Sequence, residues 1–165
     1  EASKRVFERD RLDLNEVVKE VLHTYSYHLE NNGFGLTMEL TTEALPIEAD
    51  KEAIIEVLVN LIDNGMKYSL DEKELTVSTG NRDGRAFVAV SDKGIGIAKN
   101  QSSKLFEKFY RVPTGDVHDT KGAGLGLSIV KHIIEAHDGE VQVKSEVGKG
   151  STFTLFFPMK STTDA

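Results

Sequence analysis

The sequence predicts an α+β domain in which helices pack on one face of a mostly antiparallel sheet. Three stretches, near residues 13–31, 51–68 and 127–137, carry apolar residues at helical spacing. Shorter stretches are rich in apolar residues and are separated by turn signals, which is typical of strands joined by hairpins. The 165 residues show no internal repeat and no linker, so we expect one domain with a buried core.

The first helix should begin just after Asp13, a favourable N-cap residue, with Glu16 in the position that completes a capping box. Residues 31–33 (Asn-Asn-Gly) are typical of a helix end. Between these signals the apolar side chains fall on one face of the helix: Leu14, Val17, Val18, Val21, Leu22 and Tyr25.

A strand is expected next, because Leu36, Met38 and Leu40 alternate with polar residues and should make it half-buried. Residues 46–50 are predicted to be a short extended link. The second helix should run from about residue 51 to residue 68, and its nearly continuous apolar residues predict a buried helix.

The second half of the chain begins with two strands, at residues 75–79 and 85–91, joined by a hairpin turn at 81–84. A short helix is expected at 105–110. Residues 111–123 have little core pattern, and a loop of that length is typical of a mobile lid.

After the third helix, a turn at 138–139 should lead into a strand at 140–145. A glycine-containing turn at 147–150 then leads into the last strand, at 151–157. Five predicted strands and their hairpin signals therefore favour a sheet over a helical bundle.

Composition excludes several classes of function. The net charge of −7 argues against binding a nucleic-acid backbone, which usually requires a basic patch. No apolar run reaches the roughly 18 residues of a membrane span. The chain has no cysteine, and its five histidines show no metal-binding spacing, so a zinc site is not expected.

Glycines at positions 122, 124 and 126 precede the third helix. A flexible backbone at a helix N-terminus exposes amide groups and the positive end of the helix dipole, which favours a phosphate. The spacing fits neither the dinucleotide fingerprint nor the P-loop. The alternative at this point is a flexible hinge that binds nothing.

The second helix carries a polar stripe at helical spacing: Glu56, Asn60, Asn64 and Lys67, with Tyr68 beside it. Polar groups on a buried helix are costly unless they find partners. The stripe is therefore interpreted as facing a ligand, the alternatives being internal hydrogen bonds or exposure. The amide oxygen of Asn64 suits Mg²⁺, and Lys67 could reach a phosphate.

A pocket for an adenine base is indicated by Asp92, which follows Val90 at strand spacing and should point into the core. Its carboxylate could accept a hydrogen bond from the exocyclic amino group. Gly94 and Gly96 would let the backbone approach a flat ring, and Arg111 could contact phosphate oxygens. The alternatives are an exposed turn aspartate and an ordinary surface arginine.

Five stretches stand in order along the chain: NLIDNGMKYS (60–69), DKGIG (92–96), FEKFYR (106–111), GAGLGL (122–127) and GKGSTFT (148–154). In this order they resemble the N box, first glycine box, F box, second glycine box and last-strand glycine segment of the catalytic, ATP-binding domain of sensor histidine kinases. These kinases are a branch of the Bergerat-fold ATPases. The resemblance spans roughly residues 12–158 and implies a two-layer α/β sandwich with a mobile ATP lid.

The resemblance also implies the site residues and the cofactors, ATP and Mg²⁺. Asn64 would ligate the metal, Lys67 and Arg111 would contact phosphates, Asp92 would recognise adenine N6, and Ser151 would assist near the base. The implied nucleotide-binding set is Asn60, Asn64, Lys67, Tyr68, Asp92, Gly94, Gly96, Tyr110, Arg111, Gly122, Gly124, Leu125, Gly126, Leu127 and Ser151.

Asn60 distinguishes between reactions within the resemblance. Related ATPases such as gyrase have at this position a glutamate that activates water, and an amide cannot act as a base. We therefore expect phosphoryl transfer to a histidine, with Lys67, Arg111 and Asn60 as the catalytic set. The alternatives are an anti-sigma-type serine kinase, an ATPase, or a non-catalytic ATP-dependent interaction module.

The expected organisation is a catalytic domain at 12–160, preceded at 1–11 by the tail of a helical hairpin or a linker and followed by a tail at 161–165. The acceptor histidine would lie on that separate dimerisation and phosphotransfer hairpin, since His118 has no helical flanks. The implied partners are this hairpin and a response regulator, within a homodimer. The domain itself is expected to be cytoplasmic without membrane contact, although the parent protein could be membrane-anchored.

Overall fold

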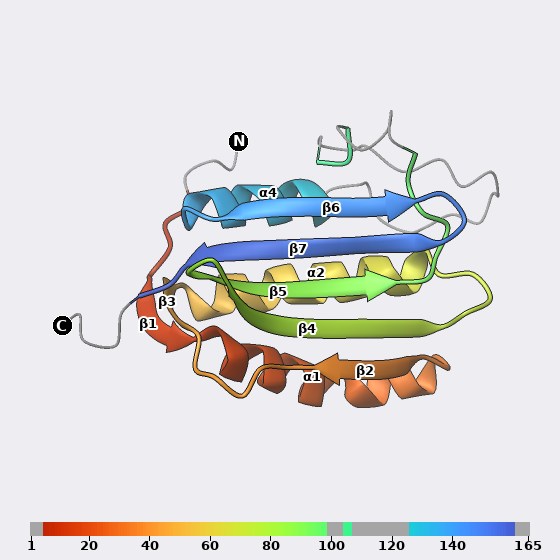
Figure 1. The fold of residues 1–165 in the computed structure, drawn as a ribbon, viewed down its shortest axis with the longest axis horizontal. Helices are drawn as coiled ribbons and strands as arrows, with labels where there is room; N and C mark the ends of the chain where they lie inside the picture. The colour runs from red at the N-terminus through yellow and green to blue at the C-terminus, as the bar shows by residue number, and fades with distance from the viewer. Residues whose placement is uncertain (1–4, 99–103, 107–125, 161–165) are drawn as a thin grey trace.

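The computed structural model describes residues 5–98, 104–106 and 126–160, which form two layers (Figure 1). One layer is a sheet whose strands lie in the order β2 (Gly35–Glu39), β4 (Glu74–Arg82), β5 (Arg85–Asp92), β7 (Gly150–Pro158) and β6 (Glu140–Glu146). Every neighbouring pair is antiparallel except β2 and β4, which are parallel. The predicted α+β class and the mostly antiparallel sheet are therefore confirmed.

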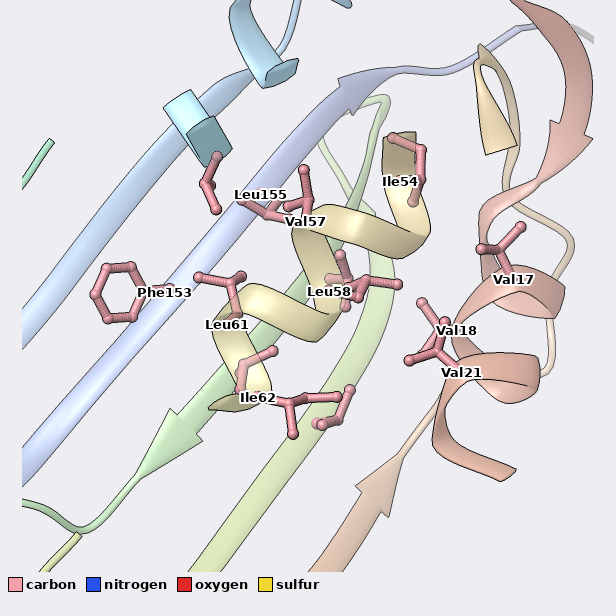
Figure 2. Packing of buried hydrophobic residues seen from close by; sticks show 14 of the residues in the cluster. Val17, Val18, Val21, Ile54, Val57, Leu58, Leu61, Ile62, Phe153 and Leu155 are labelled. Atoms are coloured by element: carbon pink, nitrogen blue, oxygen red, sulfur yellow. The ribbon is translucent and has the colours of Figure 1, made fainter. Parts of the chain in front are cut away.

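The second layer consists of α1 (Leu14–Asn31), α2 (Lys51–Lys67) and α4 (Gly126–Ala136), which cover one face of the sheet (Figure 1). Figure 2 shows apolar side chains of α1 turned toward α2, and side chains of β7 beneath α2. The labelled residues in this packing are Val17, Val18, Val21, Ile54, Val57, Leu58, Leu61, Ile62, Phe153 and Leu155. Because α2 is the central helix of the layer, polar residues on it are held in fixed positions.

The ends of α1 and α2 follow the local signals. The carboxylate of Asp13 caps α1 by accepting a hydrogen bond from the backbone N–H of Asn15, at 3.0 Å. Gly33 follows the end of α1 with a φ of +78°, a left-handed conformation that glycine adopts without strain. Asp50 caps α2, which ends at Lys67 as predicted to within one residue.

Four of the five sheet strands agree with the prediction. The hairpin turn between β4 and β5 has positive φ at Asp83 and Gly84, and a second non-glycine residue with positive φ, Asp138, lies in the turn before β6. The predicted short helix at 105–110 falls mostly outside the described residues, of which 104–106 form a turn. The predicted lid at 111–123 lies outside them entirely.

The prediction for β2 was wrong at one residue. Met38 is 57% exposed, whereas Leu36 is half-buried as expected. The reason is that β2 is an edge strand with a neighbour on one side only, so sequence alternation does not guarantee a cover for each apolar side chain.

Residues 46–50 are more than the predicted link. Pro46–Ala49 forms β3, which pairs antiparallel with β1 (Asp10–Asp13) in a separate two-stranded sheet. The sequence places residues 1–11 before the domain, yet residues 5–13 lie against it. Arg5 forms an ion pair of 2.9 Å with Glu56 of α2, and Arg9 approaches Asp138 at 3.5 Å.

A buried histidine joins the ends of two helices. His137, 1% exposed, follows α4, and its Nε2 accepts a hydrogen bond of 3.1 Å from the backbone N–H of Asp50 at the start of α2. Its Nδ1 lies 2.8 Å from the carbonyl oxygen of Ile133, so the neutral ring protonated at Nδ1 satisfies both contacts. The ring of Phe7 packs on it at 5.1 Å, and burial lowers the pKa of His137.

The stability of the domain is therefore expected to fall in mild acid. Since the pKa of His137 is lower in the folded state, the unfolded chain binds the proton first as the pH falls below about 6.5. Urea unfolding at pH 7.5 and 5.5 should show a lower free energy of unfolding at the lower pH. The contribution of this group cannot exceed about 1.4 kcal/mol per pH unit. His137→Gln should reduce the dependence of the unfolding free energy on pH, and replacing the exposed His132 with Gln should not. Equal pH dependence in the wild type and both variants would contradict the role given to His137.

Within the described residues, no helix has the length and apolar character needed to cross a membrane.

Candidate functional site

A small cavity lies where the C-terminal end of α2, the end of β5 and the start of β7 meet. It opens between two polar residues of the predicted site, Asn64 and Asp92, and a wall of apolar side chains. Its lining consists of Asn64, Tyr68, Asp92, Ile95, Gly96, Ile97, Leu105, Leu127, Ser151 and Phe153. Six of these ten are predicted site residues, so the structure brings these positions, far apart in the sequence, to one cavity.

Asp92 supplies the carboxylate of the cavity. Its Oδ1 accepts hydrogen bonds from the backbone N–H groups of Gly94, at 2.9 Å, and Ser151, at 3.3 Å. Burial raises the pKa of Asp92, while these two hydrogen bonds oppose the rise. The carboxylate is thus fixed in direction by its Oδ1, and the bonds that the structure gives it leave its Oδ2 available to a ligand.

The loop after Asp92 is held on both sides by backbone hydrogen bonds. The N–H of Ile95 donates to the carbonyl of Tyr68 at 3.0 Å, and the N–H of Gly148 donates to the carbonyl of Ile95 at 2.7 Å. A Cβ atom on Gly94 would lie 2.2 Å from the carbonyl oxygen of Tyr68. A Cβ atom on Gly96, whose φ is +73°, would lie 2.0 Å from a backbone oxygen.

These contacts explain why Gly94 and Gly96 are glycines. From the sequence, the expected reason was close approach of the backbone to a flat ring. The close approach that the structure shows is between the loop and the protein's own backbone. The glycines let the loop after β5 fit between the end of α2 and the hairpin that joins β6 to β7, and this fit places the carboxylate of Asp92 in the cavity.

The predicted polar stripe lies on the helix α2, and its members differ in what they contact. Glu56 pairs with Arg5, and Lys67 is exposed at the helix end. Asn64 is different, because its buried side-chain nitrogen has no hydrogen-bond partner within the described residues. An amide with one buried end unpaired is costly, and it indicates a site that a ligand completes.

Asn60 faces the start of α4. A Cβ atom on Gly126, the first residue of α4, would lie 3.5 Å from the side-chain oxygen of Asn60. The start of α4 therefore lies within van der Waals reach of Asn60 on α2. Leu127, the next residue, reaches the cavity. The second glycine stretch therefore ends beside the polar stripe, as the phosphate hypothesis requires.

Several predicted site residues lie outside the described part of the chain: Tyr110, Arg111, Gly122, Gly124 and Leu125. Four lining residues were not predicted: Ile95, Ile97, Leu105 and Phe153. Phe153 could have been inferred from its alternation with Ser151 along the last strand, which places both on one face. Leu105 comes from a turn with no such pattern.

The donor set fits a nucleotide bound with Mg²⁺. Within the described residues, no group of three or more His, Cys, Asp and Glu side chains could hold a metal ion. Mg²⁺ in nucleotide sites takes one or two protein oxygens and completes its shell with phosphates and water, so the side-chain oxygen of Asn64 is a suitable ligand, whereas its unpaired nitrogen can donate a hydrogen bond to the nucleotide. The apolar walls with one carboxylate at the end suit a flat base with a hydrogen-bond donor at its edge.

The family is decided by a match along the sequence. The profile of the histidine kinase-, DNA gyrase B- and HSP90-like ATPase family matches residues 49–161. The chain belongs to this family. The sensor protein RprX of Bacteroides fragilis (strain YCH46) is 39% identical to this ATPase domain over 158 residues, covering 94% of this chain and 30% of RprX.

The sensor histidine kinase YkoH of Bacillus subtilis (strain 168) is 39% identical over 146 residues, covering 88% of this chain and 31% of YkoH. The catalytic domain of histidine kinase ThkA matches the fold with a TM-score of 0.79 at 27% identity, over 93% of this chain and 97% of that domain. Full-length ShkA in complex with AMPPNP matches with a TM-score of 0.82 at 25% identity, over 97% of this chain and 33% of ShkA.

These similarities identify the chain as a catalytic, ATP-binding domain of the sensor histidine kinase type. The predicted family and its two-layer fold are confirmed. The chain spans about a third of the length of the two curated relatives named above.

Proposed function

We propose that this ATPase domain binds Mg²⁺–ATP and transfers the γ-phosphoryl group to a histidine on a separate helical hairpin of the same sensor kinase. The phosphoryl group would then pass to an aspartate of a response regulator. One observation carries the proposal: the side chain of Asn64, whose nitrogen has no partner among the described residues, and the half-buried carboxylate of Asp92 line the same cavity. An amide for a metal and a carboxylate for a base donor are what Mg²⁺–ATP needs at its two ends.

The site residues have distinct proposed roles. Asn64 would hold the metal through its side-chain oxygen, and the metal would supply neutralisation of phosphate charge. Lys67, exposed at the end of α2, contacts phosphates as a point charge. Arg111 does the same on the strength of its sequence position alone. Asp92 accepts the exocyclic amino group of adenine, Tyr68 and the apolar wall enclose the nucleotide, and Gly126 keeps the helix start open to phosphate.

The type of reaction follows from Asn60. Its side chain lies beside the start of α4, where the phosphates are proposed to bind, and an amide there can orient groups but cannot remove a proton from water. The site is therefore suited to positioning ATP for attack by an external nucleophile, with charge neutralisation as the main catalytic contribution. Within a dimeric sensor kinase, that nucleophile is supplied by the hairpin domain.

Transfer can be tested by mixing the purified chain with a separately made acceptor hairpin and γ-labelled ATP. The proposal expects acid-labile label on the hairpin histidine, and none on a hairpin in which alanine replaces that histidine. Label on serine would support the anti-sigma-type kinase instead. Free phosphate without transfer would support an ATPase, and tight binding without either product would support an interaction module.

Asp92→Asn is expected to weaken ATP binding roughly 10- to 100-fold, because a charged acceptor at the base end is replaced by an amide. The fold should survive. Because burial penalises the charge of Asp92 and raises its pKa, replacing the carboxylate with a neutral amide of the same shape should not lower the melting temperature of the nucleotide-free chain. Isothermal titration and thermal denaturation measure the two effects. Unchanged affinity would remove Asp92 from the base site.

A further inference from the structure

We propose that Ser145 is a positioning residue for base selectivity, a role that rests on the proposed ATP site. It lies on β6, does not line the cavity, and contacts the hydroxyl of Ser151, which does. By fixing the direction of that hydroxyl, Ser145 leaves Ser151 and Asp92 to present only acceptors at the base end of the cavity. Such an end accepts a 6-aminopurine and rejects a 6-oxopurine.

The position of Ser145 follows from strand register. Asp92 of β5 pairs with Ser151 of β7, and Ser151 pairs with Ser145 of β6. The three residues therefore form one row across three neighbouring strands, and paired residues project from the same face of a sheet. Ser151 is 7% exposed, and its N–H donates to Asp92. The row connects the carboxylate of the cavity with a hydroxyl outside it.

The hydroxyl of Ser145 has three close contacts. Its oxygen lies 2.7 Å from the N–H of Ile97, 3.1 Å from the carbonyl oxygen of Gly150 and 2.8 Å from the hydroxyl oxygen of Ser151. The N–H of Ile97 can only donate and the carbonyl of Gly150 can only accept. Ser145 has one hydrogen, so it donates to Gly150 and must accept from Ser151.

This is the one arrangement in which all three contacts are attractive. If Ser145 donated to Ser151 instead, its lone pairs would face the carbonyl oxygen of Gly150. The hydrogen of Ser151 is therefore committed to Ser145, and only lone pairs of Ser151 remain for the cavity. Ser151 and the carboxylate of Asp92, the two polar side chains of the strand row that line the cavity, therefore present acceptors and no donor.

The consequence concerns the edge of the purine. Adenine carries an amino donor at position 6, whereas the 6-oxopurines carry an acceptor there and a donor at N1. Asp92 could accept from N1–H of a 6-oxopurine, but O6 would then need a donor. Ser151 could supply one only if its hydroxyl rotated away from Ser145. Selectivity in such sites comes from the polar group that is left unpaired in the wrong complex.

The test compares binding of ATP and inosine triphosphate to the 165-residue chain, by displacement of a fluorescent ATP analogue with Mg²⁺ present. The wild-type chain should prefer ATP. Ser145→Ala should reduce the ratio of the two affinities roughly three- to tenfold, mainly by tighter binding of inosine triphosphate, which is the range of one net hydrogen bond. Ser145→Thr, which keeps the hydroxyl, should retain the wild-type ratio.

Two further variants distinguish orientation of the Ser151 hydroxyl from a general effect of removing a hydroxyl from the sheet. Ser91→Ala removes a hydroxyl that is hydrogen-bonded to Thr152. Ser91 and Thr152 lie on the same two strands as Asp92 and Ser151, one residue along, so their side chains project from the other face of the sheet. The ratio of ATP affinity to inosine triphosphate affinity in Ser91→Ala should equal that of the wild type. In a Ser151→Ala background, Ser145→Ala should have no further effect on the ratio, since the hydroxyl through which it acts is absent.

An unchanged ratio in Ser145→Ala, or an equal change in Ser91→Ala, would overturn the inference while leaving the ATP site intact. Failure of the wild-type chain to bind ATP would contradict the proposed function, and this inference with it. Should Ser145→Ala unfold, as judged by circular dichroism, Ser145→Cys has nearly the same volume and a weak acceptor and should show the same reduced ratio.

Discussion

Replacing Asn64 with alanine is expected to weaken binding of Mg²⁺–ATP by about a hundredfold or more. The half-buried side chain lines the cavity, and its buried nitrogen has no partner among the described residues, so the nitrogen can donate to the nucleotide while the oxygen is proposed to ligate the metal. Residues that only support metal ligands typically cost about 10- to 100-fold when they are replaced, and a direct ligand should cost at least as much. Isothermal titration at fixed Mg²⁺ measures the effect.

Metal removal provides the control. If Asn64 acts through Mg²⁺, titration in the presence of a chelator should bring the wild-type affinity close to that of Asn64→Ala. Asn64→Asp, which keeps an oxygen donor at the same place, should lie between the two in Mg²⁺. A hundredfold difference that persists without metal would show that Asn64 binds the nucleotide directly, and an unchanged affinity in Asn64→Ala would refute its role at the site.

Replacing Gly150 with alanine is expected to destabilise the domain by about 2–5 kcal/mol, as the sum of backbone strain and overpacking. Gly150 begins β7 with a φ of +124°, a conformation that is nearly restricted to glycine. A Cβ atom there would lie 2.1 Å from the backbone oxygen of Asp92. The strand start would have to move away from Asp92, so nucleotide binding should weaken as well.

Gly148 offers a matched control in the same turn. Its φ is +81°, but a Cβ atom would meet nothing within 4 Å. Gly148→Ala should therefore cost only the strain of a left-handed residue, about 1–2 kcal/mol. Urea unfolding of the two variants measures the difference, and equal destabilisation would mean that the contact with Asp92 is unimportant for the fold.

The sequence was most informative where the chemistry is local. Asn64 and Asp92 could be identified because helical spacing placed one in a polar stripe on a buried helix, and strand spacing placed the other on the core face. Both line the cavity. The caps at Asp13 and Asp50 mark helix starts in the same local way, although Asp50 was read only as the end of a link.

The sequence was least informative where two distant segments meet. Residues 10 and 11 look like the end of a charged tail until β1 is seen to pair with β3. Met38 looks like a core residue until β2 is seen to be an edge strand. His137 looks like one of five ordinary histidines until its Nε2 is found at the N–H of Asp50.

The sequence by itself determined the α+β class, the positions of most helices and strands, and the family with its nucleotide-site candidates. These follow from periodicities and motifs that are complete within a few turns or one strand. Only the tertiary structure decided the strand order and the register that aligns Ser145 with Ser151 and Asp92. The physical reason is that register depends on hydrogen bonds between strands far apart in the chain, and a shift of one residue would turn each side chain of the row to the opposite face.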